Sequence, residues 1–347
     1  MTVKRRIIIL DWLRCCALLL ILYDHLIGFR MPEWRPVIFI DKILMDPLEL
    51  IQYGGALGVS IFFMISGYLL ATGVDSGKYT IKTVPRKILC IYIPMVLSYC
   101  SFFVVQKIFS ILEYVHYFEQ FSLQDWLLGG SLLAYFTERG DVINGTMWYL
   151  IPTFIGYFLI CSFAKLFRKS VRMSFIGIEI VLGITFIMGK MLNDQAVLKK
   201  IFSYDWYVCI LLFGLIFYYF ENNKLKLQEF LCGMILNYLV LLSGAYCYAP
   251  GYISTEKYTI SIIYAILVLV LALSIHEKYD LKRTKIVNYL SELSLYIYLV
   301  HMPYGSLLIA EIERYLKFPL ALLITLFLIF IIAVFHKKCC DKILKVI

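Results

Sequence analysis

Four ionisable residues in one apolar stretch near the start of the sequence are the strongest candidates for chemistry. Asp11, Arg14, Asp24 and His25 lie within residues 5–28, a run long and apolar enough to cross a bilayer core as a helix. A charged residue at mid-depth costs about 2.5–3.5 kcal/mol on insertion scales, and ionisable residues in such spans are functional by default. Because imidazole is the usual proton acceptor at neutral pH, His25 predicts acid–base chemistry.

Helical geometry places the key side chains of this stretch on one face. Eleven residues at about 100° each make about three turns, so Arg14 and His25 leave the same face about 16 Å apart. Asp11 lies on the same stripe, and we expect it to pair with Arg14 near the cytoplasmic end. Lipid cannot solvate these groups, so the stripe should face the interior of a helical bundle. A purely structural ion pair with an interfacial histidine is the simpler alternative.

The elements that must position these residues follow from the composition. The 347 residues are 61% hydrophobic and 16% charged, with a mean hydropathy of +0.81, whereas a soluble chain is about 25% charged. We therefore predict an all-α, polytopic membrane protein with a single embedded domain over residues 1–347. Apolar windows predict ten membrane-spanning helices, at residues 7–28, 54–73, 88–111, 147–165, 173–191, 205–220, 229–248, 257–276, 289–311 and 318–336.

The distribution of basic residues predicts the orientation of these helices. With ten spans and both termini cytoplasmic, 21 of the 33 Lys and Arg residues fall on inner segments. This asymmetry also explains the net charge of +9 without a nucleic-acid partner. Residues 123–136 are apolar but short and contain two glycines, so we predict an interfacial or re-entrant segment there.

Several common features are not expected. The ten cysteines include no CxxC and predict no disulfide framework. No two histidines are three or four residues apart, so no metal site is predicted. The basic N-terminus before an apolar run imitates a signal peptide, but this run is long and charged, and we expect a retained first helix.

Four motifs occur in order along the chain. Arg14 and His25 are followed by GVSIFFMISGYLL at residues 58–70, whose small residues are typical of close helix packing. The others are PRKILCIYIP at residues 85–94, TMWYLIPTFIGYFL at 146–159 and LSELSLYIYLVHMP at 290–303. In this order and spacing they resemble the acyltransferase 3 family of membrane O-acyltransferases, which includes sugar and polysaccharide O-acetyltransferases.

The resemblance implies roles for particular residues. His25 would be the general base, Arg14 would hold the donor or a substrate oxygen, and Asp11 would orient Arg14. At the cytoplasmic face, Arg86 and Lys87 suit the phosphates of an acyl-CoA. The candidates for pocket walls and secondary polar contacts are Ser66, Trp148, Tyr298 and His301.

The sequence also departs from the family pattern at two places. Cys90 stands where a second arginine of a pair is expected, and no glutamate follows Trp148 closely. The first departure weakens the inference that a pair of arginines acts here. The second weakens the inference about the acceptor more than the inference about the reaction.

The predicted function is transfer of an acyl group, with acetyl as the expected one, from cytoplasmic acyl-CoA to a hydroxyl of a surface glycan or its lipid-linked saccharide precursor. Acyl-CoA is the donor substrate, no bound cofactor is expected, and the partners besides donor and acceptor are membrane lipids. By resemblance, the location is a bacterial cytoplasmic membrane. The alternatives are a transporter or flippase for a lipid-linked sugar, and a non-catalytic assembly partner that would tolerate loss of His25.

Overall fold

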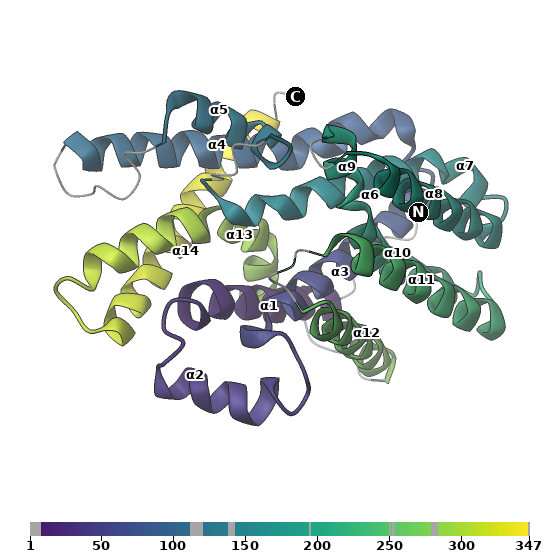
Figure 1. Cartoon of the computed structure of the whole chain (residues 1–347), viewed down its shortest axis with the longest axis horizontal. Helices are drawn as coiled ribbons and strands as arrows, with labels where there is room; N and C mark the ends of the chain where they lie inside the picture. Colours follow the sequence, from purple (N-terminus) through teal and green to yellow (C-terminus); the bar gives the residue numbers. More distant parts are fainter. Residues whose placement is uncertain are drawn as a thin grey trace. The chain divides into compact units, whose positions relative to one another are not determined.

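The computed structural model describes residues 8–111, 121–137, 143–193, 196–249, 251, 254–278 and 284–345, and these residues form helices and connecting turns without a strand (Figure 1). Contacts divide the chain into two compact units, each of which is described by itself. Unit 1 comprises residues 1–84 and 152–292, and unit 2 comprises residues 85–151 and 293–347. The single domain predicted from the sequence stays a prediction.

Nine helices among the described residues are long and apolar enough to cross a membrane. Each lies over one of the predicted spans, which confirms an all-α polytopic membrane protein. The helices are α3 (Gly55–Asp75), α4 (Val84–Ile111), α6 (Leu150–Ser162) extended by the 3₁₀ turn η6 (Gly145–Tyr149), α8 (Val171–Met191), α10 (Val208–Glu221), α11 (Leu227–Tyr248), α12 (Thr255–Lys278), α13 (Lys285–Ile312) and α14 (Phe318–Leu344).

The predicted first span is also helical. The α-helix α1 (Ile8–Tyr23) continues into a π-helical turn, η1 (Asp24–Gly28), and the two together are about 30 Å long, which matches the thickness of a bilayer core. This helix contains Asp11, Arg14 and Asp24. The tenth span predicted from the sequence depends on this helix and stays a prediction; the basic residues before residue 8 lie outside the described part of the chain.

Shorter elements connect the spans. The loop after η1 contains α2 (Arg35–Ile40) and the turns η2 (Asp41–Met45) and η3 (Gln52–Gly54). The segment predicted to be interfacial forms an eight-residue helix, α5 (Leu123–Gly130), which is too short to span a bilayer. Its first turn is capped by Ser122 and Asp125. Residues 112–120 and 138–142, which include His116 and Glu138, lie outside the described part of the chain.

Helix α10 is the centre of unit 1. Its sequence is apolar on every side, and all its residues from Val208 to Tyr219 are buried, as expected for a helix enclosed by others. Two glycines allow it to cross α3 closely. A Cβ on Gly67 of α3 would overlap the carbonyl oxygen of Leu211, and a Cβ on Gly214 of α10 would overlap that of Met64. The packing role predicted for the small residues of α3 is therefore confirmed.

We expect Gly67→Ala and Gly214→Ala each to lower the thermal unfolding temperature of the detergent-solubilised protein. The added methyl group meets backbone, which cannot rotate away, and overpacking of this kind costs about 1–3 kcal/mol. The matched control is Gly183→Ala in α8, where a Cβ would meet nothing within 4 Å. Equal melting of all three variants would contradict the close α3–α10 crossing.

Candidate functional site

His25 lies in the π-helical turn that ends the first span. The Nε2 atom of His25 is 3.6 Å from Oδ2 of Asp24, and the His25 side chain is 20% exposed. A π-turn widens the helix and is often found at functional sites. Here it leaves the imidazole partly accessible beside a buried carboxylate. From the sequence, Asp24 is recognised as an ionisable residue but no role is predicted for it; its position next to His25 is the available signal.

The carboxylate of Asp24 is placed against the start of α3. Gly54 precedes that helix with a left-handed backbone (φ 73°), and Gly55 is its first residue. A Cβ on Gly55 would overlap the Asp24 carboxylate, so only glycine leaves room for it there. Free backbone N–H groups and the helix dipole make a helix N-terminus favourable for an anion. The start of α3 therefore holds the carboxylate that contacts His25.

At the other end of the first helix, Asp11 is buried against α13. Ser291 donates a hydrogen bond of 2.6 Å from Oγ to Oδ1 of Asp11, and both residues are buried. Cys15, one turn further along α1, donates from Sγ to the carbonyl oxygen of Val287 at 3.7 Å. These contacts place the Asp11 end of the helix inside unit 1. The pairing of Asp11 with Arg14 stays a prediction.

The stripe from Asp11 to His25 is turned toward protein. Between Arg14 and His25, the same face carries Leu18 and Ile21, which are 4% and 1% exposed. Trp12, Cys16 and Leu19, at helical spacing on the other side of α1, are exposed instead. This arrangement is the one expected for a helix whose ionisable groups avoid lipid.

In unit 2, Tyr298 and His301 are tied into a hydrogen-bonded cluster. The Tyr298 hydroxyl donates to the carbonyl oxygen of Thr146. The Nδ1 atom of His301 is 2.7 Å from the carbonyl oxygen of Tyr298, and because a carbonyl only accepts, Nδ1 carries the proton. His301 is fully buried, whereas Trp148 on η6 is half-buried.

A proline two residues after His301 leaves a neighbouring carbonyl group without its helical donor. Pro303 lies inside α13 and has no N–H to donate to the carbonyl oxygen of Leu299. Two side chains replace that donor: Ser98 Oγ of α4 at 3.1 Å and Asn144 Nδ2 at 3.3 Å. Asn144 is only 2% exposed, so its Asn-Gly-Thr triplet is part of the packing of unit 2.

The remaining predicted site residues are placed as follows. Ser66 is half-buried in the middle of α3, in unit 1. Arg86 is exposed and Lys87 half-buried in the first turn of α4, in unit 2. Unit 1 thus brings together Asp24 and His25 at one end of the first helix, and unit 2 brings together Tyr298 and His301. No group of three or more His, Cys, Asp or Glu side chains suited to a metal occurs among the residues that the structure describes.

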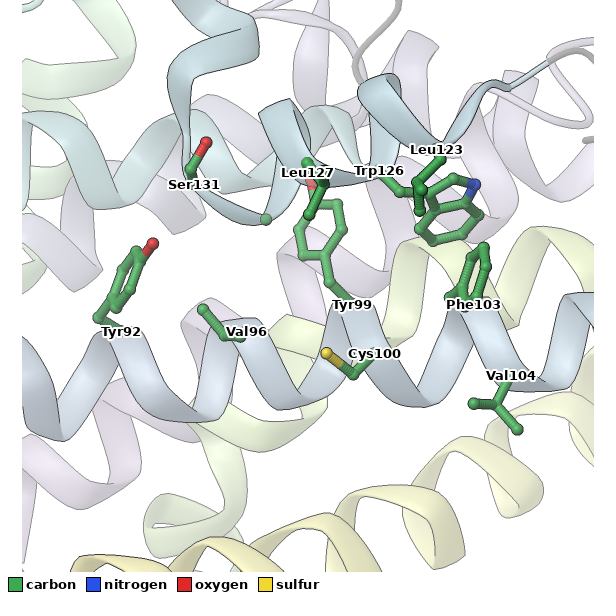
Figure 2. A pocket seen from close by; sticks show the side chains of 11 residues that line it. Tyr92, Val96, Tyr99, Cys100, Phe103, Val104, Leu123, Trp126, Leu127 and Ser131 are labelled. Atoms are coloured by element: carbon green, nitrogen blue, oxygen red, sulfur yellow. The ribbon is translucent and has the colours of Figure 1, made fainter.

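Unit 2 also contains an apolar pocket of about 460 Å³ between α4 and α5 (Figure 2). Tyr92, Tyr99 and Phe103 line it from α4, and Trp126 and Leu127 line it from α5. The rings of Phe103 and Trp126 meet edge to face, with centroids 5.0 Å apart. The nine residues predicted for the site do not contribute to its lining.

The fold and the first helix define a class of protein: a multi-pass, all-helical membrane protein with an aspartate–histidine contact inside a charged span. The chain belongs to the acyltransferase 3 family, because the family model, described as an acyltransferase domain, matches residues 7–337. The comparison with curated proteins gives no match, and neither does the comparison with solved structures. The protein is therefore a membrane acyltransferase.

Proposed function

We propose that this protein transfers an acyl group, most simply acetyl, from cytoplasmic acyl-CoA to a hydroxyl group of a cell-surface glycan or its lipid-linked precursor. The observation that carries the proposal is the contact between His25 and Asp24, in a charged first span of a chain from an acyltransferase family. The bacterial cytoplasmic membrane is the proposed location.

The reaction needs a general base, a group that binds an oxygen of the donor or acceptor, and residues that bind the donor. His25 accepts the proton of the acceptor hydroxyl as the hydroxyl oxygen bonds to the acyl carbon. The carbon–sulfur bond of the thioester then breaks, and CoA leaves as a thiolate that takes up a proton. Asp24 supports the imidazolium that forms during this step, since their side chains are 3.6 Å apart. Arg14 binds an oxygen of donor or acceptor, and Asp11 orients its guanidinium.

The donor's phosphates bind the basic residues that begin α4. Arg86 is exposed there and Lys87 is half-buried, and the positive-inside distribution assigns this end to the cytoplasm. An arginine matches phosphate geometry with two parallel hydrogen bonds, while lysine acts as a point charge.

We expect Arg86→Gln to raise the KM for acyl-CoA about tenfold with little change in kcat, because the phosphates are remote from the reacting carbon and one lost charge-assisted hydrogen bond is worth about 1.5–3 kcal/mol. Lys87→Gln should have a smaller effect of the same kind. Lys82→Gln, an exposed lysine just before α4, is the matched control. An unchanged KM in Arg86→Gln would remove this residue from donor binding.

Transfer itself is tested with the purified full-length protein in lipid nanodiscs, radiolabelled acetyl-CoA, and polysaccharide or lipid-linked saccharide from the source cells. Label in the saccharide fraction that alkali releases as acetate supports the proposed O-acetyl transfer. In cells, the ester signals in the NMR spectrum of the surface polysaccharide should disappear on deletion of the gene. Unchanged ester signals and no labelled saccharide would overturn the glycan acceptor and favour another acyl acceptor or saccharide transport.

A further inference from the structure

A group of buried polar atoms in unit 1 lies outside the site described above. Within the described part of the chain, no protein group hydrogen-bonds to Oε2 of Glu179, Oδ1 of Asp205 or Oδ1 of Asn237. These residues are only 6%, 3% and 0% exposed. Leaving a buried polar atom without a partner costs about 1–3 kcal/mol, and more for a charge. Three such oxygens on neighbouring helices therefore call for a ligand that supplies hydrogen-bond donors or positive charge.

The packing of α8 against α11 brings Glu179 level with Asn237. A Cβ on Gly244 would meet Phe186, and the Tyr248 hydroxyl donates to the carbonyl oxygen of Phe186 at 2.8 Å. Glu179 is seven residues before Phe186, and Asn237 is seven before Gly244, which is about two turns in each helix. The two helices run parallel, because Gly189, further along α8, packs against Tyr248.

Helix α10 completes the surroundings of this pair. The Asn237 Nδ2 atom donates to the carbonyl oxygen of Cys209 at 2.9 Å. This leaves Oδ1 of Asn237 as the free acceptor of the amide. Cys209 lies within electrostatic range of both Glu179 and Asp205. Asp205 belongs to the turn η7 (Asp205–Tyr207) at the start of α10, one turn before Cys209.

A pocket of about 410 Å³ lies at the N-terminal ends of α8 and α11. Its lining includes Ile176 on α8 and Gly233 on α11, and helical spacing puts Glu179 and Asn237 one turn further along the same faces. The charged and amide side chains of its lining are Arg172, Gln228 and Glu229. The positive-inside distribution assigns this end to the cytoplasm.

The chemistry of the pair points to one ligand. All of the unpartnered atoms of Glu179 and Asn237 are acceptors, so a bound proton both removes the carboxylate charge and turns Glu179 into a donor. We propose that Glu179, level with Asn237 between α8 and α11, is a protonation site inside the membrane that exchanges protons through the pocket below it. The titratable or charged groups on the elements packed around this site include Asp205, Cys209, Tyr219, Glu229, Cys232, Tyr248 and Arg172.

Such a site has a use in the proposed reaction, and this use rests on the proposed function. When an acyl group moves from a thioester to a hydroxyl, the hydroxyl proton is released at His25 and the CoA thiolate takes up a proton on the cytoplasmic side. Asp205, Glu179 and the pocket follow one another along α8, α10 and α11. Buried carboxyls in series are typical of proton relays in membrane proteins.

The first measurement uses no acyl transfer. The full-length protein in phosphatidylcholine nanodiscs is treated with N,N′-dicyclohexylcarbodiimide, an apolar reagent that attacks protonated carboxyl groups, and labelled peptides are mapped by mass spectrometry. We expect label on Glu179 that declines as the pH is raised, and an infrared carbonyl band of protonated carboxyl that disappears in the isosteric variant Glu179→Gln. The exposed Glu292 should stay unlabelled. Absence of both the label and the band would overturn the protonation site.

A second variant tests the route of the proton without touching Glu179. Gly233→Leu fills the pocket, since a Cβ there has Ile216 at 3.9 Å as its nearest neighbour. We expect labelling of Glu179 to slow severalfold in Gly233→Leu and to stay unchanged in Gly183→Leu, where an added Cβ meets nothing within 4 Å. Equal labelling in both would overturn access through the pocket. If Glu179→Gln abolishes acetyl transfer and Glu179 of the wild type is labelled as expected, the result supports a proton relay through Glu179. If the variant transfers acetyl groups at the normal rate, the relay is overturned, whereas the protonation site is still supported by the labelling.

Discussion

Replacement of His25 by alanine is expected to lower kcat for acyl transfer about 10²–10⁴-fold, the range that a general base contributes. The imidazole is only partly buried and lies in a terminal π-turn, so the side chain can be removed with little effect on packing. Acyl transfer is measured with radiolabelled donor, and the amount of protein in the membrane is quantified in parallel.

Cys16→Ala is the matched control for His25→Ala, because Cys16 is exposed on the opposite face of the same helix. Its activity should equal that of the wild type. If His25→Ala keeps full activity while Cys16→Ala behaves normally, another residue is the base, and the reading of the protein as a non-catalytic assembly partner gains support.

The second large effect is expected at the carboxylate behind His25. We expect Asp24→Asn to lower kcat about tenfold, the equivalent of about 1.4 kcal/mol of transition-state stabilisation, with little change in either KM. The isosteric amide keeps the shape but removes the charge that faces the imidazolium. Gly55→Ala should reproduce this loss, because the new Cβ displaces the carboxylate from the start of α3.

The double variant Asp24→Asn/Gly55→Ala separates this mechanism from general destabilisation. If Gly55 acts only by making room for Asp24, the double variant should lose no more activity than either single variant, as two residues of one contact are not additive. The backbone of Gly55 (φ −60°) is compatible with alanine, and Gly183→Ala again controls for a glycine replacement in a helix. Fully additive losses would contradict the proposed role of Gly55.

The membrane spans follow from the sequence because lipid imposes a simple rule. Every spanning backbone group must be satisfied within its own helix, and so a window of apolar residues is close to sufficient to place one. Even the short sixth span, α10 with its η7 turn, and the non-spanning α5 lie where hydropathy and length predict them. The charged first helix is also predicted by such a hydropathy window, because its four ionisable residues are outnumbered by apolar ones.

The surroundings of the candidate base do not follow from the sequence, because they depend on residues distant in the chain. Gly55 falls at the start of the predicted span 54–73 with no signal of a special role, yet it admits the Asp24 carboxylate to the start of α3. Ser291, which donates to Asp11, is 280 residues away from it. Likewise, the sequence shows Pro303 inside a span, but only the packed structure shows that Ser98 and Asn144 serve the carbonyl that this proline leaves free. The local sequence pattern shows where such residues lie in a helix, but their partners are determined by tertiary packing.

The enclosure of α10 has a consequence for how the protein is made. No side of Val208–Tyr219 is left for lipid in the mature fold, yet α3 is synthesised long before α10. Until α10 leaves the ribosome, the surface of α3 around Gly67 contacts lipid. This is because α10, with which α3 makes its most extensive contacts, has not yet been synthesised. Assembly of unit 1 is therefore completed late in synthesis. Chains truncated before residue 208 should be degraded by membrane quality-control proteases even though their first helices are correctly inserted.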